Sequence, residues 1–386
     1  MGERIYLDNA STTFPKPPIV AKAVYSYMTE AGTNIGRGDY SSAYGVEDAV
    51  FETRELLCVL LGGEDPSQVV FTRNVTESIN LLLKGFLQPG DHVVVTNMEH
   101  NAVMRPLTQL TAKGITFSRA ICSPEGNLDP SEIERLVTPR TKLVLTTHAS
   151  NVCGTATPIR EIAKICRAHG VRYAVDAAQT AGVMPINARA WGIDAVCFTG
   201  HKGLLGPQGI GGIVFTGDFS NEVSALVAGG TGSSSDLEEM PPFMPDRLEA
   251  GTPNLPGIVG LGAGIEWINS KGIDAIREHE LMLTGRLMEG MAPLEEAGLV
   301  RIVGKKDLTG RTGVVSIQTP RHELAQIAHS LDSKYGIQVR VGLHCAPSAH
   351  KTLGTFPTGT IRFSMGWANT KKDVDRAIKA LDALLS

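Results

Sequence analysis

The sequence contains few cysteines, and their number and spacing exclude two kinds of structural site. Six cysteines among 386 residues lie far below the density of disulfide-stapled scaffolds. No two of them form a Cys-x-x-Cys pair, so we expect no structural zinc site and no other metal site. Most should be small buried apolar residues of a protein in a reducing compartment. The six cysteines are Cys58, Cys122, Cys153, Cys166, Cys197 and Cys345.

Long apolar runs and an excess of basic charge are also missing. No stretch of about 18 apolar residues exists, so we expect no transmembrane helix. Residues 1–8 contain no apolar run of the kind that a signal peptide has. Lys and Arg number 36 against 40 Asp and Glu, a net charge of −4, whereas nucleic-acid-binding and membrane-surface proteins are typically basic. We therefore expect a cytoplasmic protein that binds neither nucleic acid nor membranes.

The composition is otherwise that of a folded protein with a large core. Hydrophobic residues make up 42% and charged residues 20%, which excludes a chain that is disordered throughout. Glycine accounts for 42 residues, about 11% where ~7% is usual. This excess indicates many tight turns and close approaches of the backbone.

Between about residues 69 and 216, short β-branched runs alternate with stretches of helical periodicity. Continuous apolar strands between helices predict an α/β fold, with a mostly parallel sheet covered on both faces. In such sheets a ligand binds beyond the carboxyl ends of the strands, so the residues that end the strands are the candidates for function. Strands are predicted at 69–72, 92–96, 142–147, 171–176, 195–198 and 212–215, and helices at 76–87, 102–113 and 159–169.

The pattern changes in the last 170 residues of the chain. Residues 217–256 are rich in Gly, Ser, Pro and acidic residues, which predicts loops, and 229–235 is expected to be mobile. A long helical stretch then leads into a mixed pattern of strands and helices. We predict a large domain over residues 15–255 and a smaller α+β domain over 1–14 and 256–386. The smaller domain has predicted strands at 300–303, 314–317, 337–340 and 361–364, and helices at 324–335 and 371–384.

A lysine between glycines, just beyond a predicted buried strand, is the strongest local signal. Lys202 in the segment Thr-Gly-His-Lys-Gly can be desolvated, which lowers its pKa and makes its amine a nucleophile, although a solvated loop lysine is the common alternative. Asp176 ends another strand, where a carboxylate caps a helix or holds a cation. A lysine and an aspartate at adjacent strand ends together suit a pyridoxal phosphate site, with the lysine as Schiff base and the aspartate on the pyridinium nitrogen.

Four other polar segments are expected near that site. Residues 74–78 follow a strand and open a helix, so they suit a phosphate or form an ordinary helix cap. His100 ends the next strand and suits stacking on a pyridine ring, or is a plain loop histidine. Residues 148–151 place the amide of Asn151 at a further strand end. Residues 249–254 form a polar loop that joins the two domains.

Eight short motifs occur in one order along nearly the whole chain. They are 7–10 (Leu-Asp-Asn-Ala), 76–80 (Thr-Glu-Ser-Ile-Asn), 99–100 (Glu-His), 150–154 (Ser-Asn-Val-Cys-Gly), 176–179 (Asp-Ala-Ala-Gln), 200–202 (Gly-His-Lys), 249–254 (Glu-Ala-Gly-Thr-Pro-Asn) and 340–346 (Arg-Val-Gly-Leu-His-Cys-Ala). Together and in this order, they resemble the class-V aminotransferase family of pyridoxal phosphate fold type I, and most of all its cysteine desulfurase and selenocysteine lyase branch. The resemblance implies a large domain with a smaller one closing over it, and a homodimer with the active site at its interface.

The resemblance also implies a role for individual residues. Lys202 would hold pyridoxal phosphate, and Asp176 would keep its pyridine nitrogen protonated. Gln179 would bond its phenolic oxygen, and His100 would stack on its ring. The cofactor phosphate would lie among Val75, Thr76, Thr199 and His201, with Thr252 contributed by the other subunit. The substrate carboxylate would lie among Asn151 and Arg362, with Arg340 as a helper.

Cys345 is set apart from the other cysteines. Gly342 and Pro347 bracket it in a predicted loop between two strands, and His344 and Arg340 lie nearby in sequence and would favour its thiolate. From the residues alone, a packing cysteine is the alternative. The resemblance implies that Cys345 attacks the sulfur of the substrate. The predicted catalytic residues are thus Lys202, Cys345 and His100.

The resemblance implies an enzyme that removes sulfur from L-cysteine to give L-alanine and a Cys345 persulfide, which passes to an acceptor protein as in iron–sulfur cluster assembly. The alternatives are a selenocysteine lyase, a class-V transaminase, and a non-catalytic pyridoxal phosphate protein that carries sulfur. The Cys345 loop argues against the transaminase, and Lys202 with Asp176 argues against the non-catalytic protein. Three segments depart from the best-known members and bear on substrate preference and on the acceptor: Asn101, 34–40 and 346–351.

Overall fold

A seven-stranded sheet forms the centre of the computed structural model, which describes residues 4–35, 41–234 and 236–386. Its strands are β2 (Val69–Thr72), β3 (His92–Thr96), β4 (Thr116–Ala120), β5 (Thr141–Thr147), β6 (Arg172–Asp176), β7 (Ala195–Thr199) and β8 (Gly211–Phe215). They lie in the order β2-β8-β7-β6-β5-β3-β4. Strands β3 to β7 are mutually parallel, and only β8 runs against its neighbours β7 and β2. The predicted mostly parallel sheet is confirmed.

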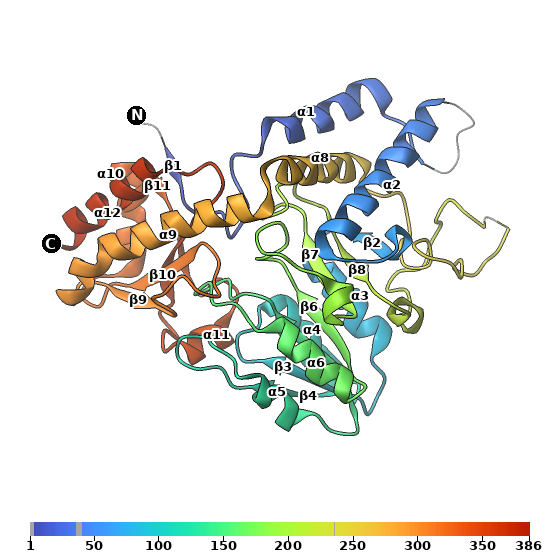
Figure 1. The fold of residues 1–386 in the computed structure, drawn as a ribbon, viewed down its shortest axis with the longest axis horizontal. Helices are drawn as coiled ribbons and strands as arrows, with labels where there is room; N and C mark the ends of the chain where they lie inside the picture. The colour runs from blue at the N-terminus through green and yellow to red at the C-terminus, as the bar shows by residue number, and fades with distance from the viewer. Residues whose placement is uncertain (1–3, 36–40, 235) are drawn as a thin grey trace.

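Helices cover both faces of this sheet (Figure 1). Successive residues of a strand point to opposite faces, so a continuous apolar strand places apolar side chains on both. Val94 of β3 belongs to one apolar core, and its neighbours Val93 and Val95 belong to the other. Both faces are therefore buried, as the continuous apolar strands predicted. The first core lies under α2 (Ser41–Leu61), α5 (Pro130–Leu136), α6 (Ile159–Ala168), α7 (Ala188–Trp191) and α8 (Leu255–Lys271), and the second under α3 (Val75–Phe86) and α4 (Asn101–Thr111).

Helix α8 packs closely against α2 and against α1 (Pro18–Ser26), as Figure 1 shows. Two glycines of α8 permit this approach. A Cβ atom added to Gly260 would lie 2.7 Å from a methyl of Val24, and one added to Gly262 would lie 2.6 Å from Oγ1 of Thr53. Shorter helical segments are η1 (Tyr27–Ala31), η2 (Pro66–Gln68) and η3 (Phe219–Glu222). No helix in the described ranges is both long and apolar enough to cross a membrane.

A second, antiparallel sheet lies at the end of the molecule where β1 (Ile5–Tyr6) and α12 (Lys371–Leu385) also lie (Figure 1). Its strands are β9 (Arg301–Val303), β10 (Val314–Gln318), β12 (Arg340–Gly342) and β13 (Thr360–Ser364), in the order β12-β13-β10-β9. Strand β1 pairs instead with β11 (Ile337–Gln338). The helices of this half are α9 (Ile273–Glu296), α10 (Leu324–Tyr335), α11 (Pro347–Thr352) and α12.

The single strand predicted at 337–340 is wrong in its extent. Two short strands, β11 and β12, replace it, and they pair with different partners, β1 and β13. The apolar core of this half contains Ile5 and Leu7 together with residues from Leu283 to Leu385. The division into 15–255 and 1–14 plus 256–386 stays a prediction, and this shared core supports grouping the first residues with the last hundred.

A buried ion pair fixes the loop that leads to Thr252. Arg54 of α2 donates from Nη1 and Nη2 to the two carboxylate oxygens of Glu249, each at 2.8 Å. Glu249 Oε1 also accepts the backbone N–H of Phe71 at 2.6 Å. The side chains of Arg54 and Glu249 are only 7% and 16% exposed.

Glu249→Gln is expected to lower the free energy of unfolding by roughly 3 kcal/mol, because removing one charge of a buried pair leaves the other uncompensated. Asp375→Asn is the matched control, since it breaks the exposed pair with Arg286 and should leave the unfolding midpoint almost unchanged. Denaturant unfolding followed by circular dichroism measures both variants. Equal shifts would contradict a special contribution of the buried pair.

Candidate functional site

Lys202 lies in a tight turn that follows β7. Its side chain is partly buried, and its carbonyl oxygen accepts the Thr13 hydroxyl and the Leu205 N–H, each at 2.9 Å. Burial lowers the pKa of the Lys202 amine to about 8, and the Asp176 carboxylate opposes this shift. The amine is therefore neutral far more often near neutral pH than that of a solvated lysine, which is the state that a nucleophile or a general base needs.

Asp176 ends β6, the neighbour of β7 in the sheet, so the predicted juxtaposition of the two strand ends is present. The residue is 3% exposed, and its carboxylate accepts the N–H of Ala178 at 2.9 Å. Burial raises the pKa of Asp176, while the Ala178 N–H and the Lys202 charge lower it. A buried carboxylate with so few partners suits a cationic ring nitrogen beside it.

His100 forms the N-cap of α4. Its Nδ1 accepts the N–H of Ala102 at 3.0 Å, so the remaining ring proton belongs on Nε2. Burial, and then the Lys202 charge, lowers the pKa of His100 to about 4. A neutral imidazole suits stacking on a ring better than ion pairing. Gln179 lies near the Lys202 turn, and its amide nitrogen donates to the carbonyl of Ala10 at 3.1 Å.

The residues predicted to bind the cofactor phosphate lie at the start of α3 and at or just after the end of β7. Val75 and Thr76 form the first turn of α3, where Asn74 caps the N–H of Glu77 and the helix dipole favours an anion. Thr199 and His201 flank the glycine before Lys202. Thr252 lies on the surface, beside a pocket that also has Arg73, Glu77 and Gly209 in its wall.

These residues fit pyridoxal phosphate. Thr199 Oγ1 and His201 Nδ1 are buried, yet neither has a hydrogen-bond partner within the described residues. Buried polar atoms are normally satisfied, so two such atoms beside Lys202 indicate a missing polar ligand. A phosphate supplies the acceptors, and a protonated pyridine nitrogen supplies a charged hydrogen-bond donor, which no residue in the described ranges gives to the Asp176 carboxylate.

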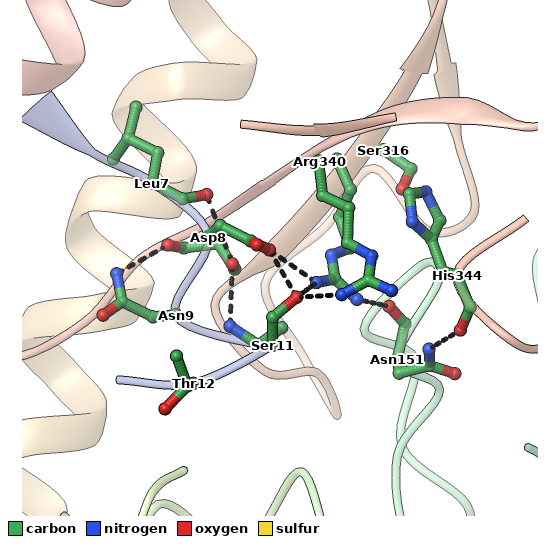
Figure 2. A network of polar contacts seen from close by, with 12 residues as sticks. Leu7, Asp8, Asn9, Ser11, Thr12, Asn151, Ser316, Arg340 and His344 are labelled. Atoms are coloured by element: carbon green, nitrogen blue, oxygen red, sulfur yellow. Dashed lines mark hydrogen bonds and ion pairs between the residues drawn. The ribbon is translucent and has the colours of Figure 1, made fainter. Parts of the chain in front are cut away.

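Arg362 and Arg340 lie opposite each other on β13 and β12. Figure 2 shows Asp8, Ser11 and Arg340 converging, with Asn151 and His344 beside them. Arg362 is 2% exposed and donates from Nη1 to the backbone oxygen of Asn151 at 2.9 Å. Burial lowers the pKa of Arg362, and the Asp8 carboxylate opposes the shift.

The Cys345 loop is fastened to this site from two sides. The carbonyl of Cys345 accepts the N–H of Asn101, at 2.8 Å, and the carbonyl of His344 accepts the side-chain amide of Asn151, at 2.7 Å. His344 and Cys345 both have positive φ, of 48° and 58°, which few non-glycine residues adopt. The Cys345 side chain is exposed, and the other five cysteines are buried. The backbone of the loop is thus held by Asn101 and Asn151, and the loop carries an exposed thiol.

One expectation for this loop is wrong. His344 was expected to favour a thiolate by its charge, but its ring is buried and its Nε2 lies 2.9 Å from Thr360 Oγ1. Burial, and then the charge of Arg362, lowers its pKa to about 2. The imidazole is therefore neutral, and it supports the loop rather than the charge of Cys345.

Sequence reasoning gave no role to two residues that the structure brings into the site. Asp8 and Ser11 contact the arginines, and the only signal was the place of Asp8 in the motif 7–10. Of the segments that depart from the best-known members, residues 36–40 lie outside the described residues. Residues 347–352 form α11, and Asn101 begins α4.

Comparison with known sequences gives matches along nearly the whole chain. A family model described as aminotransferase class-V matches residues 5–377. A probable cysteine desulfurase of Methanothermobacter thermautotrophicus is 35% identical, covering 100% of this chain and 95% of the relative. A cysteine desulfurase of Dickeya dadantii is 30% identical, covering 97% of this chain and 90% of the relative.

Comparison with solved structures also gives cysteine desulfurases that match nearly the whole chain. The apo cysteine desulfurase of Thermococcus onnurineus superposes with a TM-score of 0.92 at 33% identity, covering 99% of this chain and 94% of that one. The cysteine desulfurase CsdA of Escherichia coli, in an S-sulfonic acid form, superposes with a TM-score of 0.85 at 28% identity, covering 99% and 96%. The fold is therefore that of pyridoxal phosphate fold type I.

The lowered pKa of Lys202 predicts how its reaction with an aldehyde depends on pH. Only the neutral amine attacks, and burial brings its pKa from 10.5 to about 8. Covalent uptake of pyridoxal phosphate by the cofactor-free protein should therefore accelerate with rising pH and level off above about pH 8. Stopped-flow absorbance measures the rate, and Lys202→Ala should show no covalent uptake. A rate that still rises toward pH 10 would show that the amine is solvated.

Proposed function

We propose that this chain, which belongs to the class-V aminotransferase family, is a pyridoxal-phosphate-dependent cysteine desulfurase. It would remove the sulfur of L-cysteine, release L-alanine and keep the sulfur on Cys345 as a persulfide. The observation that carries this proposal is the position of Cys345. Its side chain is exposed, and its loop is hydrogen-bonded to Asn101, the residue after His100, and to Asn151, whose backbone oxygen accepts Arg362.

Cofactor binding follows from the polar groups around Lys202. When bound, pyridoxal phosphate supplies an electron sink that lets a proton leave the Cα atom of an amino acid. Lys202 would hold it covalently, with Asp176 beside the ring nitrogen. His100 would lie against the ring as a neutral imidazole. The remaining contacts would come from Gln179 on the phenolic oxygen, and from Val75, Thr76, Thr199 and His201 on the phosphate.

The substrate would be oriented by its carboxylate. Arg362 provides a buried guanidinium for it, with Asn151 and Arg340 alongside. With the substrate in place, the Lys202 amine would be free to accept a proton. Its pKa of about 8 suits a base that takes up the Cα proton and returns it near neutral pH.

Cys345 would carry out the sulfur transfer. Its thiolate attacks the sulfur of the substrate, an S–S bond forms, and the C–S bond breaks with its electron pair left on the substrate carbon. Protonation of that carbon gives alanine, and the sulfur stays on Cys345 as a persulfide. The exposure of Cys345 supports onward transfer to an acceptor protein, such as one that assembles iron–sulfur clusters.

A homodimer belongs to the same proposal. Thr252 is exposed at the end of the loop that the Arg54–Glu249 pair fixes, so it is free to complete the phosphate site of a second copy.

The proposed location is the cytoplasm. Five of the six cysteines are buried, and the chain has no excess of Lys and Arg over Asp and Glu, both of which are compatible with that location.

Asp176→Asn is expected to lower kcat for alanine formation from L-cysteine roughly 10- to 150-fold, because a charge-assisted pair worth about 1.5–3 kcal/mol is lost. The assay is run with saturating pyridoxal phosphate, so that weaker cofactor binding does not enter. A change smaller than threefold would contradict the pairing of Asp176 with the ring nitrogen.

Cys345→Ala is expected to keep the absorbance of bound pyridoxal phosphate but to lose sulfide release from L-cysteine at least about 100-fold. Cys166→Ala, at a buried site in α6, is the matched control and should retain activity. Sulfide and alanine are measured together, with reductant present.

Full desulfuration of cysteine by Cys345→Ala would overturn the role of Cys345. An assay with selenocysteine distinguishes the proposed desulfurase from a selenocysteine lyase. A selenol is more acidic than a thiol and leaves more readily, so a selenocysteine lyase needs no thiol at position 345. Wild-type protein that acts on selenocysteine and leaves cysteine unchanged would be a selenocysteine lyase. Conversion of an amino acid with an oxo acid and no sulfide would indicate a transaminase.

A further inference from the structure

Two positively charged side chains face each other beside the proposed substrate site. Arg340 and Arg362 are directly opposed in the antiparallel pair of β12 and β13. Like charges in this position repel, and the cost grows as they leave water. Arg362 is 2% exposed, so a counter-charge from the protein is needed to hold the pair in place.

Asp8 supplies that counter-charge, and Ser11 links it to both arginines. Arg362 Nη2 donates to Asp8 Oδ1 and to Ser11 Oγ, both at 2.7 Å, and Arg340 Nη1 donates to the same Ser11 Oγ at 2.7 Å. Ser11 Oγ in turn donates its only hydrogen to Asp8 Oδ1 at 2.8 Å. One hydroxyl therefore links both guanidinium groups to one carboxylate.

The turn that carries these two residues is itself fixed. The hydroxyl of Tyr6 lies 3.1 Å from the carbonyl of Asp8 and 2.9 Å from that of Thr12, to which it donates. Asp8 also bridges Ser364 at the end of β13. The carboxylate is thus presented to Arg362 by backbone contacts that do not depend on a ligand.

The hydrogen bonds of Arg362 leave one group without a partner. Nη1 donates to Asn151 and Nη2 donates twice, but Nε is buried and finds no acceptor among the residues described. A carboxylate that binds a guanidinium through two parallel bonds uses Nε together with the adjacent Nη2. Both hydrogens of Nη2 are already engaged, so an incoming carboxylate must take over one of those bonds.

We propose that Asp8 is a placeholder for the substrate carboxylate: it occupies Arg362 in the free enzyme and gives up Nη2 when substrate arrives, while Ser11 keeps both arginines aligned. Charge supports the exchange, because two guanidinium groups face one internal carboxylate and one more anion balances them. Asp8 and Ser11 are positioning residues that act through Arg362. The identity of the amino acid in this inference rests on the proposed function, whereas the binding of a carboxylate by Arg362 does not.

The placeholder predicts opposite effects for two neighbouring substitutions. Asp8→Asn removes the competing anion, so a ligand carboxylate should bind about threefold or more tightly. Ser11→Ala leaves the charge and removes the link between the arginines, so the same ligand should bind about tenfold more weakly. Asp8→Glu keeps an anion and should not tighten binding. Damage to the fold alone would weaken binding in every variant.

Calorimetric titration of the holoenzyme with two small thiols measures these effects. 3-Mercaptopropionate carries the thiol and the carboxylate of cysteine without the amine, and cysteamine carries the thiol and the amine without the carboxylate. Only 3-mercaptopropionate should respond to the substitutions. Asp129→Asn, which keeps an exposed helix cap at α5, is the matched control and should change neither dissociation constant. If Asp8→Asn does not fold, Asp8→Ser removes the same carboxylate.

Steady-state kinetics with L-cysteine adds a second readout. Ser11→Ala should raise KM about tenfold with little change in kcat, because the loss lies in binding. Weaker binding of 3-mercaptopropionate by Asp8→Asn, or equal changes with cysteamine, would overturn the placeholder. If the opposite shifts are found in a wild-type protein that makes no alanine from cysteine, the placeholder stands and the proposed function fails.

Discussion

The site depends on the hydrogen bonds of residues 8–13, which join its two halves. At one end, Asp8 pairs with Arg362 on the small sheet. At the other end, Thr13 donates its N–H to the carbonyl of His201 at 3.1 Å and its hydroxyl to that of Lys202 at 2.9 Å. A chain segment of six residues therefore sets the position of the carboxylate-binding guanidinium relative to the reactive amine.

Desolvation is the second constraint, and it acts on opposite charges in opposite ways. Burial lowers the pKa of Lys202 to about 8 and raises that of Asp176, and the charge of each group opposes the shift in the other. The same burial keeps His100 and His344 neutral, with pKa values of about 4 and about 2. The cationic groups of the site are thereby reduced to the lysine and the two arginines, and the substrate carboxylate has a defined place to go.

The parts of the site that sequence predicted are those with a local signature. Strand ends can be located from apolar runs, so the sequence predicts Asp176 and Lys202 at neighbouring strand ends. The contact between Asp8 and Arg362 spans 354 residues and leaves no local pattern. Burial is also a property of the whole fold, which is why the neutral His344 was missed. An apolar run predicts a strand but not the strand with which it pairs. The sequence of residues 337–340 therefore gives no sign that β11 and β12 belong to two different sheets.

The central claim is that sulfur from cysteine passes through Cys345, and mass spectrometry tests it most directly. The holoenzyme is mixed with one equivalent of L-cysteine without reductant, quenched, alkylated and digested. The account predicts one added sulfur atom on the peptide that contains Cys345, an equal amount of alanine, and no added sulfur on the five buried cysteines. Alanine formed with Cys345 unmodified, or sulfur found on another cysteine, would contradict it.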